Sequence, residues 1–162
     1  MMKHALLLAL VLLFAVTGSG CSSQSTLSGH APDFTLDDLD GGAVTLSDLE
    51  GQVVVLDFWA VWCSPCVEAL PHLQQLHEQY AGREVVVLAI NVSEDRDEVA
   101  EFMAEHGYTL TVLLDGDGRV ADDYGVRGIP HTIIVDRDGE MYPVLGGIDD
   151  VEDTLLSRLV EK

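Results

Sequence analysis

The pattern of apolar residues along the chain is that of an α/β protein. Short runs rich in β-branched residues, as expected of strands in a largely buried sheet, occupy residues 53–58, 85–90, 111–114, 132–135 and 142–145. Stretches with a helical pattern predict helices over 64–80, 97–106, 120–124 and 149–160. Because strands alternate with helices, the sequence predicts one layer of β-sheet covered by helices.

The end of the chain departs from this alternation. Asp138 and Gly139 form a tight-turn signal between the last two predicted strands, which therefore form an antiparallel hairpin and make the sheet mixed. The final predicted helix begins at Asp149, an acidic residue suited to capping.

The first residues read as a secretory signal and not as part of the fold. Lys3 and His4 precede an apolar run over 5–16, which is shorter than the ~20 residues that span a bilayer. Small residues then lead to Cys21, an arrangement that resembles the bacterial lipoprotein signal, in which this cysteine becomes a lipid-modified N-terminus. The alternative is an ordinary cleaved signal that leaves a free thiol. Both place the domain outside the cytoplasm.

These features divide the chain into three parts. We expect a lipoprotein-type signal peptide over 1–20, a flexible tether of mainly small and polar residues over 21–30, and a single folded domain over 31–162. Lys and Arg total 8 against 28 Asp and Glu, a net charge of −20, which argues against nucleic acid as a partner. The acidity either keeps the surface soluble or steers basic substrates.

Two cysteines in the domain carry the candidate chemistry. Cys63 and Cys66 follow the first long strand and stand where a helix begins. Unpaired N–H groups at a helix start stabilise a thiolate, so Cys63 is the expected nucleophile and Cys66, one turn away, the expected resolving thiol. Pro65 lies in the first helical turn, where its missing N–H costs little. Ser64 and Pro65 are the candidate residues for tuning the redox potential.

The same spacing has other uses. Half of a zinc site also reads Cys-x-x-Cys, and His131 could add a third ligand, but the domain has no second cysteine pair. A purely structural disulfide is the other alternative, although so small a loop restrains the unfolded chain very little.

Several motifs together resemble those of thioredoxins. The resemblance rests on residues 56–60, 62–66, Pro71 and 128–130, and it covers nearly the whole domain. Residues 31–36 and 46–51 are similar to those of the membrane-tethered TlpA and ResA type of thiol-disulfide oxidoreductase. The resemblance implies a thioredoxin-like fold with a mixed central sheet flanked by helices, an N-terminal β extension and an inserted helix between Asn91 and Thr111.

The resemblance also assigns site residues. Ile129 and Pro130 match a cis-proline loop that binds an extended substrate strand, the alternative being an ordinary trans proline. Asp57 matches a buried carboxylate that exchanges a proton with the resolving cysteine, the alternative being an Asp that faces solvent at a strand end. Trp62 is expected at the substrate surface and Trp59 in the core. His131 is a candidate for tuning the thiolate.

The implied function is the reduction of protein disulfides outside the cytoplasm. In tethered relatives the substrates include apocytochrome c during cytochrome c maturation, and a membrane thiol-relay protein supplies the electrons. The dithiol is the only redox group expected, with no further cofactor and no metal. A peroxiredoxin-like thiol peroxidase is one alternative, but its Thr-x-x-Cys motif is absent. A copper-binding module using Cys63, Cys66 and His131 is another. The direction of electron flow stays open.

Overall fold

The computed structural model describes residues 29–147 and 150–160. The expected signal peptide, Cys21, most of the expected tether and Asp149 lie outside the described residues. The elements, in chain order, are β1 Thr35–Asp37, β2 Ala43–Thr45, the 3₁₀ helix η1 Leu46–Leu49, β3 Val53–Trp59, α1 Ser64–Tyr80, β4 Val85–Val92, α2 Arg96–His106, β5 Thr111–Asp115, α3 Arg119–Asp123, β6 His131–Val135, β7 Met141–Pro143 and α4 Val151–Val160.

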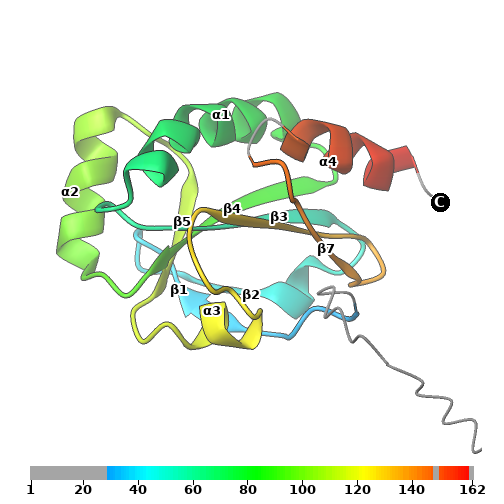
Figure 1. Cartoon of the computed structure of the whole chain (residues 1–162), viewed down its shortest axis with the longest axis horizontal. Coiled ribbons are helices and arrows are strands. Elements are labelled where there is room, and N and C mark those ends of the chain that lie inside the picture. Colours follow the sequence, from blue (N-terminus) through cyan, green and yellow to red (C-terminus); the bar gives the residue numbers. More distant parts are fainter. Residues whose placement is uncertain (1–28, 148–149, 161–162) are drawn as a thin grey trace, which may run out of the picture.

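A mixed five-stranded sheet forms the centre of the domain. Its strand order is β5-β4-β3-β6-β7, in which β3, β4 and β5 are parallel while β6 and β7 run antiparallel to their neighbours. Helices α1 and α4 cover one face, and α3 lies on the other with the β1–β2 hairpin (Figure 1). This confirms the predicted central mixed sheet, the N-terminal β extension and the inserted helix, which is α2.

Alternate residues of β3 supply two separate cores. Val53, Val55 and Trp59 pack on the side of α1, α2 and α4, whereas Val54 and Phe58 pack on the side of α3 and the hairpin. All seven residues of β3 are buried, because the strand is flanked by β4 and β6 and covered on both faces. The continuous apolar run in the sequence reflects this double coverage.

The sheet brings the segments that contain the candidate site residues to one edge, namely the edge formed by the C-terminal ends of its parallel strands. Strands β3, β4 and β5 end at this edge, and β6 begins there because it runs antiparallel to β3, with His131 opposite Phe58. The turn after β3, the loop after β4 and the loop before β6 therefore meet. The segment that contains both cysteines leaves β3 at this edge.

The ends of the domain differ in detail from the prediction. β7 ends at Pro143, not at residue 145, and Leu145 is 94% exposed. One further hydrogen bond, from the Val144 N–H to the Thr132 oxygen at 2.9 Å, follows Pro143 before the chain leaves β6. The last residues of the expected tether, Gly29 and His30, belong to the folded domain, since the Met141 N–H donates to the Gly29 oxygen at 2.9 Å and His30 bridges to Glu140. No helix among residues 29–147 and 150–160 is long and apolar enough to cross a membrane.

Candidate active site

Cys63 and Cys66 are joined by a disulfide at the N-terminus of α1. The two sulfurs are 2.08 Å apart and the two Cα atoms 5.2 Å apart. Cys63 is the N-cap of α1, and the Cys66 N–H donates to its sulfur at 3.3 Å. A short turn presents this cap, closed by a hydrogen bond of 3.1 Å from the Cys63 N–H to the Ala60 oxygen. The Cys63 sulfur thus lies where helix N–H groups stabilise negative charge.

The two cysteines differ in their access to solvent. Cys63 is 5% exposed, whereas Cys66 is completely buried against the core under α1. Ser64 and Pro65, between them, are exposed, and Pro65 is in the first turn of the helix as expected. Of the two cysteines, only Cys63 therefore has surface that an approaching thiol or disulfide can contact.

The loop before β6 contains the cis peptide bond expected between Ile129 and Pro130, so the alternative of a trans proline is wrong. The pairing of Phe58 with His131 sets this loop next to the end of β3. Trp62 is 69% exposed, and with Ile129 it lines a shallow hollow of about 530 Å³. Pro130 lines a different hollow, described next. Trp59, in contrast, is buried in the core as expected.

Asp57 is a carboxyl group inside the sheet. It is 1% exposed, so the alternative of an Asp that faces solvent is wrong. The Thr132 hydroxyl donates to its Oδ1 at 2.7 Å, and its Oδ2 has no protein partner. Burial raises the pKa of Asp57 to about 7, and the Thr132 hydrogen bond opposes this shift. A hollow of about 320 Å³, lined by Asp57, Ala69, Pro130 and Thr132 among others, reaches this carboxyl group.

Of His72, His77 and His131, only His131 lies near the candidate site. His131 lines the same hollow as Asp57, and burial lowers the pKa of its ring while its Nε2 lacks a hydrogen-bond partner. His72 is exposed and His77 half-buried on α1. Among the described residues, no group of three or more His, Cys, Asp or Glu side chains could hold a metal ion.

Three polar residues at this edge of the sheet were missed by sequence reasoning. Glu94 accepts a hydrogen bond of 2.8 Å from the Val61 N–H in the turn before Cys63, and the Asn91 side chain donates to the same oxygen at 2.6 Å. Asp115, at the end of β5, accepts from the N–H groups of Val120 and Ala121 and so holds the start of α3. The available signal was the placement of Asn91 and Asp115 at or near the ends of two buried parallel strands.

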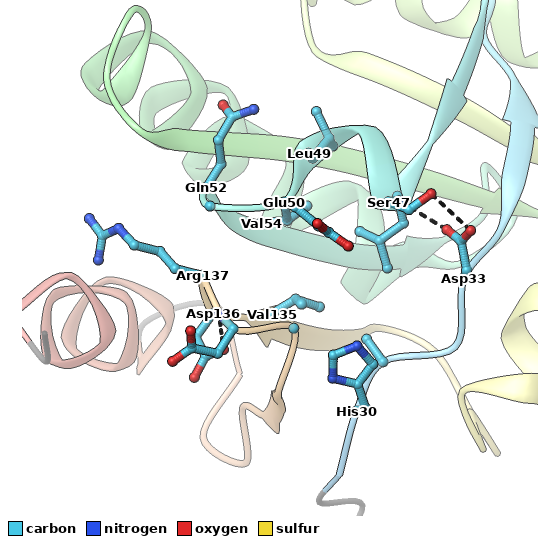
Figure 2. Close-up of a pocket in the computed structure, with 15 residues that line it drawn as sticks. His30, Asp33, Ser47, Leu49, Glu50, Gln52, Val54, Val135, Asp136 and Arg137 are labelled. Atoms are coloured by element: carbon cyan, nitrogen blue, oxygen red, sulfur yellow. Dashed lines mark hydrogen bonds between the residues drawn. The ribbon is translucent and has the colours of Figure 1, made fainter.

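A third hollow lies at the other end of the sheet. Its volume is about 670 Å³, and Figure 2 shows residues from the start of β3 and the end of β6, including Val54 and Val135, around it. Asp33 accepts hydrogen bonds from the backbone and hydroxyl of Ser47 there. The hollow is remote from the dithiol, because Cys63 follows the opposite end of β3.

Comparison with known proteins agrees with this geometry. Residues 27–143 match the AhpC/TSA family. The thiol-disulfide oxidoreductase ResA of Geobacillus thermodenitrificans (strain NG80-2) is 36% identical over 123 residues, which cover 76% of this chain and 71% of that protein. The ResA of Halalkalibacterium halodurans is 35% identical over 118 residues, or 73% of this chain and 67% of that protein.

Solved structures share the fold over most of the chain. A Chlorobium tepidum protein assigned as thiol:disulfide interchange protein DsbE superposes with a TM-score of 0.71 at 33% identity, covering 82% of this chain and 96% of that one. The exposed lipoprotein thioredoxin Etrx1 of Streptococcus pneumoniae has a TM-score of 0.68 at 31% identity, with 78% and 99% covered. The predicted thioredoxin-like fold is thereby confirmed, and the chain belongs to the AhpC/TSA family as a thiol-disulfide oxidoreductase of the ResA type.

Proposed function

We propose that this protein reduces disulfide bonds of proteins outside the cytoplasm, with Cys63 as the attacking thiolate. The observation that carries this proposal is the pairing of a slightly exposed cysteine at a helix N-terminus with a completely buried second cysteine. In such a site the Cys63 sulfur attacks the protein disulfide, and the Cys66 sulfur then resolves the mixed disulfide from the protein interior. The ResA-type relatives support the chemistry but not its direction.

The reaction proceeds in two exchanges. The Cys63 thiolate attacks one sulfur of the substrate disulfide, which forms a mixed disulfide and releases the other substrate sulfur as a thiolate. Cys66 then loses its proton and attacks the Cys63 sulfur, which releases the second substrate thiolate and leaves the Cys63–Cys66 disulfide. The substrate gains two electrons, and its two thiolates take up one proton that Cys66 has lost and one from solvent, while the dithiol is oxidised to the disulfide found in the structure.

Asp57 is the proposed acceptor of the Cys66 proton. Cys66 is completely buried, so its proton needs a nearby base, and a carboxyl group with a pKa of about 7 exchanges protons near neutral pH. Trp62, Ile129 and the cis Pro130 form the proposed docking surface for an extended segment of substrate. Ser64 and Pro65 are proposed to set the redox potential through the first turn of α1. We expect no further cofactor.

We also propose a lipid anchor at Cys21, which would hold the domain on the outer side of a bacterial membrane. The leader over 1–20 supports this, as does the likeness to an exposed lipoprotein thioredoxin of Streptococcus pneumoniae. A membrane thiol-relay protein would return the electrons. Apocytochrome c is the proposed substrate, on the strength of the resemblance to the TlpA and ResA type.

The first experiment is the reduction potential of the Cys63–Cys66 couple in the domain that starts at residue 22, equilibrated against glutathione and dithiothreitol buffers. We expect a potential near or below the cytosolic glutathione poise, together with reduction of a disulfide-bonded peptide that carries the haem-binding cysteines of a cytochrome c. A potential well above that poise would make the protein an oxidase or isomerase and overturn the reductase proposal.

The same sample tests the alternatives. Consumption of hydrogen peroxide at the rate of disulfide reduction would favour a thiol peroxidase, although Ala60 stands where a Thr-x-x-Cys motif needs threonine. Binding of copper by the reduced protein more tightly than by a thiol-blocked control would favour a copper-binding module.

A further inference from the structure

The turn that presents Cys63 is held from a neighbouring strand. The turn uses the Cys63 N–H and the Ala60 oxygen for its own closing hydrogen bond. The Val61 N–H is not used in this way and donates instead to Glu94 Oε2, at 2.8 Å. Glu94 follows β4, so this bond ties the turn after β3 to the loop after the adjacent strand.

Glu94 is itself held in place from two directions. The side chain of Asn91, which is completely buried beside Trp59, donates to the same carboxylate oxygen at 2.6 Å. Ser93 has a left-handed backbone with a φ of 61°, and its N–H donates to the Asp115 oxygen at 3.0 Å. Such a backbone conformation is uncommon for residues other than glycine, and it ends β4 by a sharp change of direction just before Glu94. The carboxylate is thereby fixed beneath the turn.

Stability alone does not explain a carboxylate at this position. Glu94 Oε1, Asn91 Oδ1 and the indole nitrogen of Trp59 are all buried without a protein partner. Burying polar atoms that lack partners costs free energy, and Glu94 Oε1 adds to this cost while Oε2 alone serves both donors. The cost of this polar cluster, which lies next to the turn that presents Cys63, indicates a role in the chemistry of that cysteine.

We propose that Glu94 is a positioning residue for the nucleophile. Its hydrogen bond to Val61 fixes the turn so that the Cys63 sulfur stays at the N-terminus of α1, where the Cys66 N–H donates to it. The hydrogen bond therefore favours the thiolate, whereas the negative charge of the carboxylate opposes it. Glu94 sets the balance of these two effects. The inference rests on Cys63 being the nucleophile of the proposed function.

Two substitutions separate the hydrogen bond from the charge. Glu94→Gln keeps an acceptor for the Val61 N–H and removes the charge, so the pKa of Cys63 should fall. Glu94→Asp keeps the charge but is one methylene too short to reach Val61, so the pKa of Cys63 should rise. The measurement is the rate at which iodoacetamide alkylates Cys63 of the reduced protein as a function of pH, with the modified cysteine identified by mass spectrometry.

The expected result is a shift in opposite directions. Below the pKa of Cys63, the Gln variant should be alkylated about threefold faster and the Asp variant about threefold slower than the unmodified protein, which corresponds to about half a pKa unit each way. Glu98→Gln, which removes an exposed charge from α2, should leave the profile unchanged. A wild-type profile in the Asp variant, or shifts of the same sign in both variants, would overturn the proposal.

The measurement does not depend on the identity of the substrate. Alkylation reports the state of Cys63 even if the protein fails to reduce any protein disulfide. Failure of the reductase proposal and failure of the role of Glu94 are therefore distinguishable.

Discussion

Thr132 and Asp57 are hydrogen-bonded across the antiparallel pair of β6 and β3, with 2.7 Å between Thr132 Oγ1 and Asp57 Oδ1. This single hydrogen bond leaves the other carboxyl oxygen buried without a protein partner. The buried Asp57 is consequently harder to ionise, with its pKa raised to about 7. The pair links the stability of the domain to pH and, in the proposed mechanism, to the second thiol exchange.

Asp57→Asn should stabilise the protein at alkaline pH. The folded state holds the Asp57 proton more tightly than the unfolded chain, whose pKa is near 3.8, so stability present below pH 4 is lost as the pH rises toward 7. The loss is of the order of 4 kcal/mol, and the Asn variant lacks it. Urea unfolding of the oxidised proteins should show the variant more stable by roughly 2–4 kcal/mol at pH 8. An equal difference at pH 4 and pH 8 would contradict this.

Thr132→Val should raise the pKa of Asp57 further. The hydroxyl of Thr132 favours the ionised carboxylate, and its removal leaves desolvation unopposed. We expect a rise of about one unit, measured by ¹³C NMR titration of the Asp57 carboxyl carbon, and a matching alkaline shift in the pH dependence of disulfide reduction. Thr132→Ser retains a hydroxyl and serves as the control, since both profiles should stay near those of the unmodified protein.

The two tryptophans of the motif should respond in opposite ways to alanine. Trp59 is completely buried, so Trp59→Ala should cost about 3–5 kcal/mol of unfolding free energy. Trp62 is mostly exposed, so Trp62→Ala should change stability by less than about 0.5 kcal/mol while raising the KM for protein disulfides. Chemical unfolding and steady-state kinetics measure the two effects. An unchanged KM would remove Trp62 from the docking surface.

Cys66→Ser should trap the substrate. Without the resolving thiol, the mixed disulfide on Cys63 persists and appears as a higher-mass species on non-reducing gels. Cys63→Ser should give no such species, because the remaining sulfur is completely buried. Adducts of equal yield in both variants would show that either sulfur can attack and would contradict the assigned order.

Much of the fold was predictable because its strands are covered on both faces. The apolar runs at 53–58 and 85–90 fall within β3 and β4, and the structure extends the strands by a residue or two. The end of the chain was less predictable. Leu145 continues the apolar pattern, but it follows the last hydrogen bond to β6, which Val144 makes, and its side chain is exposed.

The dithiol was predictable from local sequence, whereas its support was not. Cys63, Pro65 and Cys66 lie within one turn at the start of α1, so their spacing in the sequence is enough to predict that the two sulfurs lie close together. Glu94 acts on the same turn from 33 residues away, and only the pairing of β3 with β4 brings the two together. In the sequence, Glu94 is one of four acidic residues over 94–98, and nothing in the pattern distinguishes it from the other three.

The difference in burial between the two sulfurs also constrains the catalytic cycle. Because Cys66 is completely buried and only Cys63 has any exposed surface, the protein that delivers electrons and the protein that receives them must use the same sulfur, that of Cys63, at different times. Turnover should then follow ping-pong kinetics, with donor and acceptor as mutual competitors and no ternary complex. The domain would work as a shuttle that must release one partner before it can meet the next.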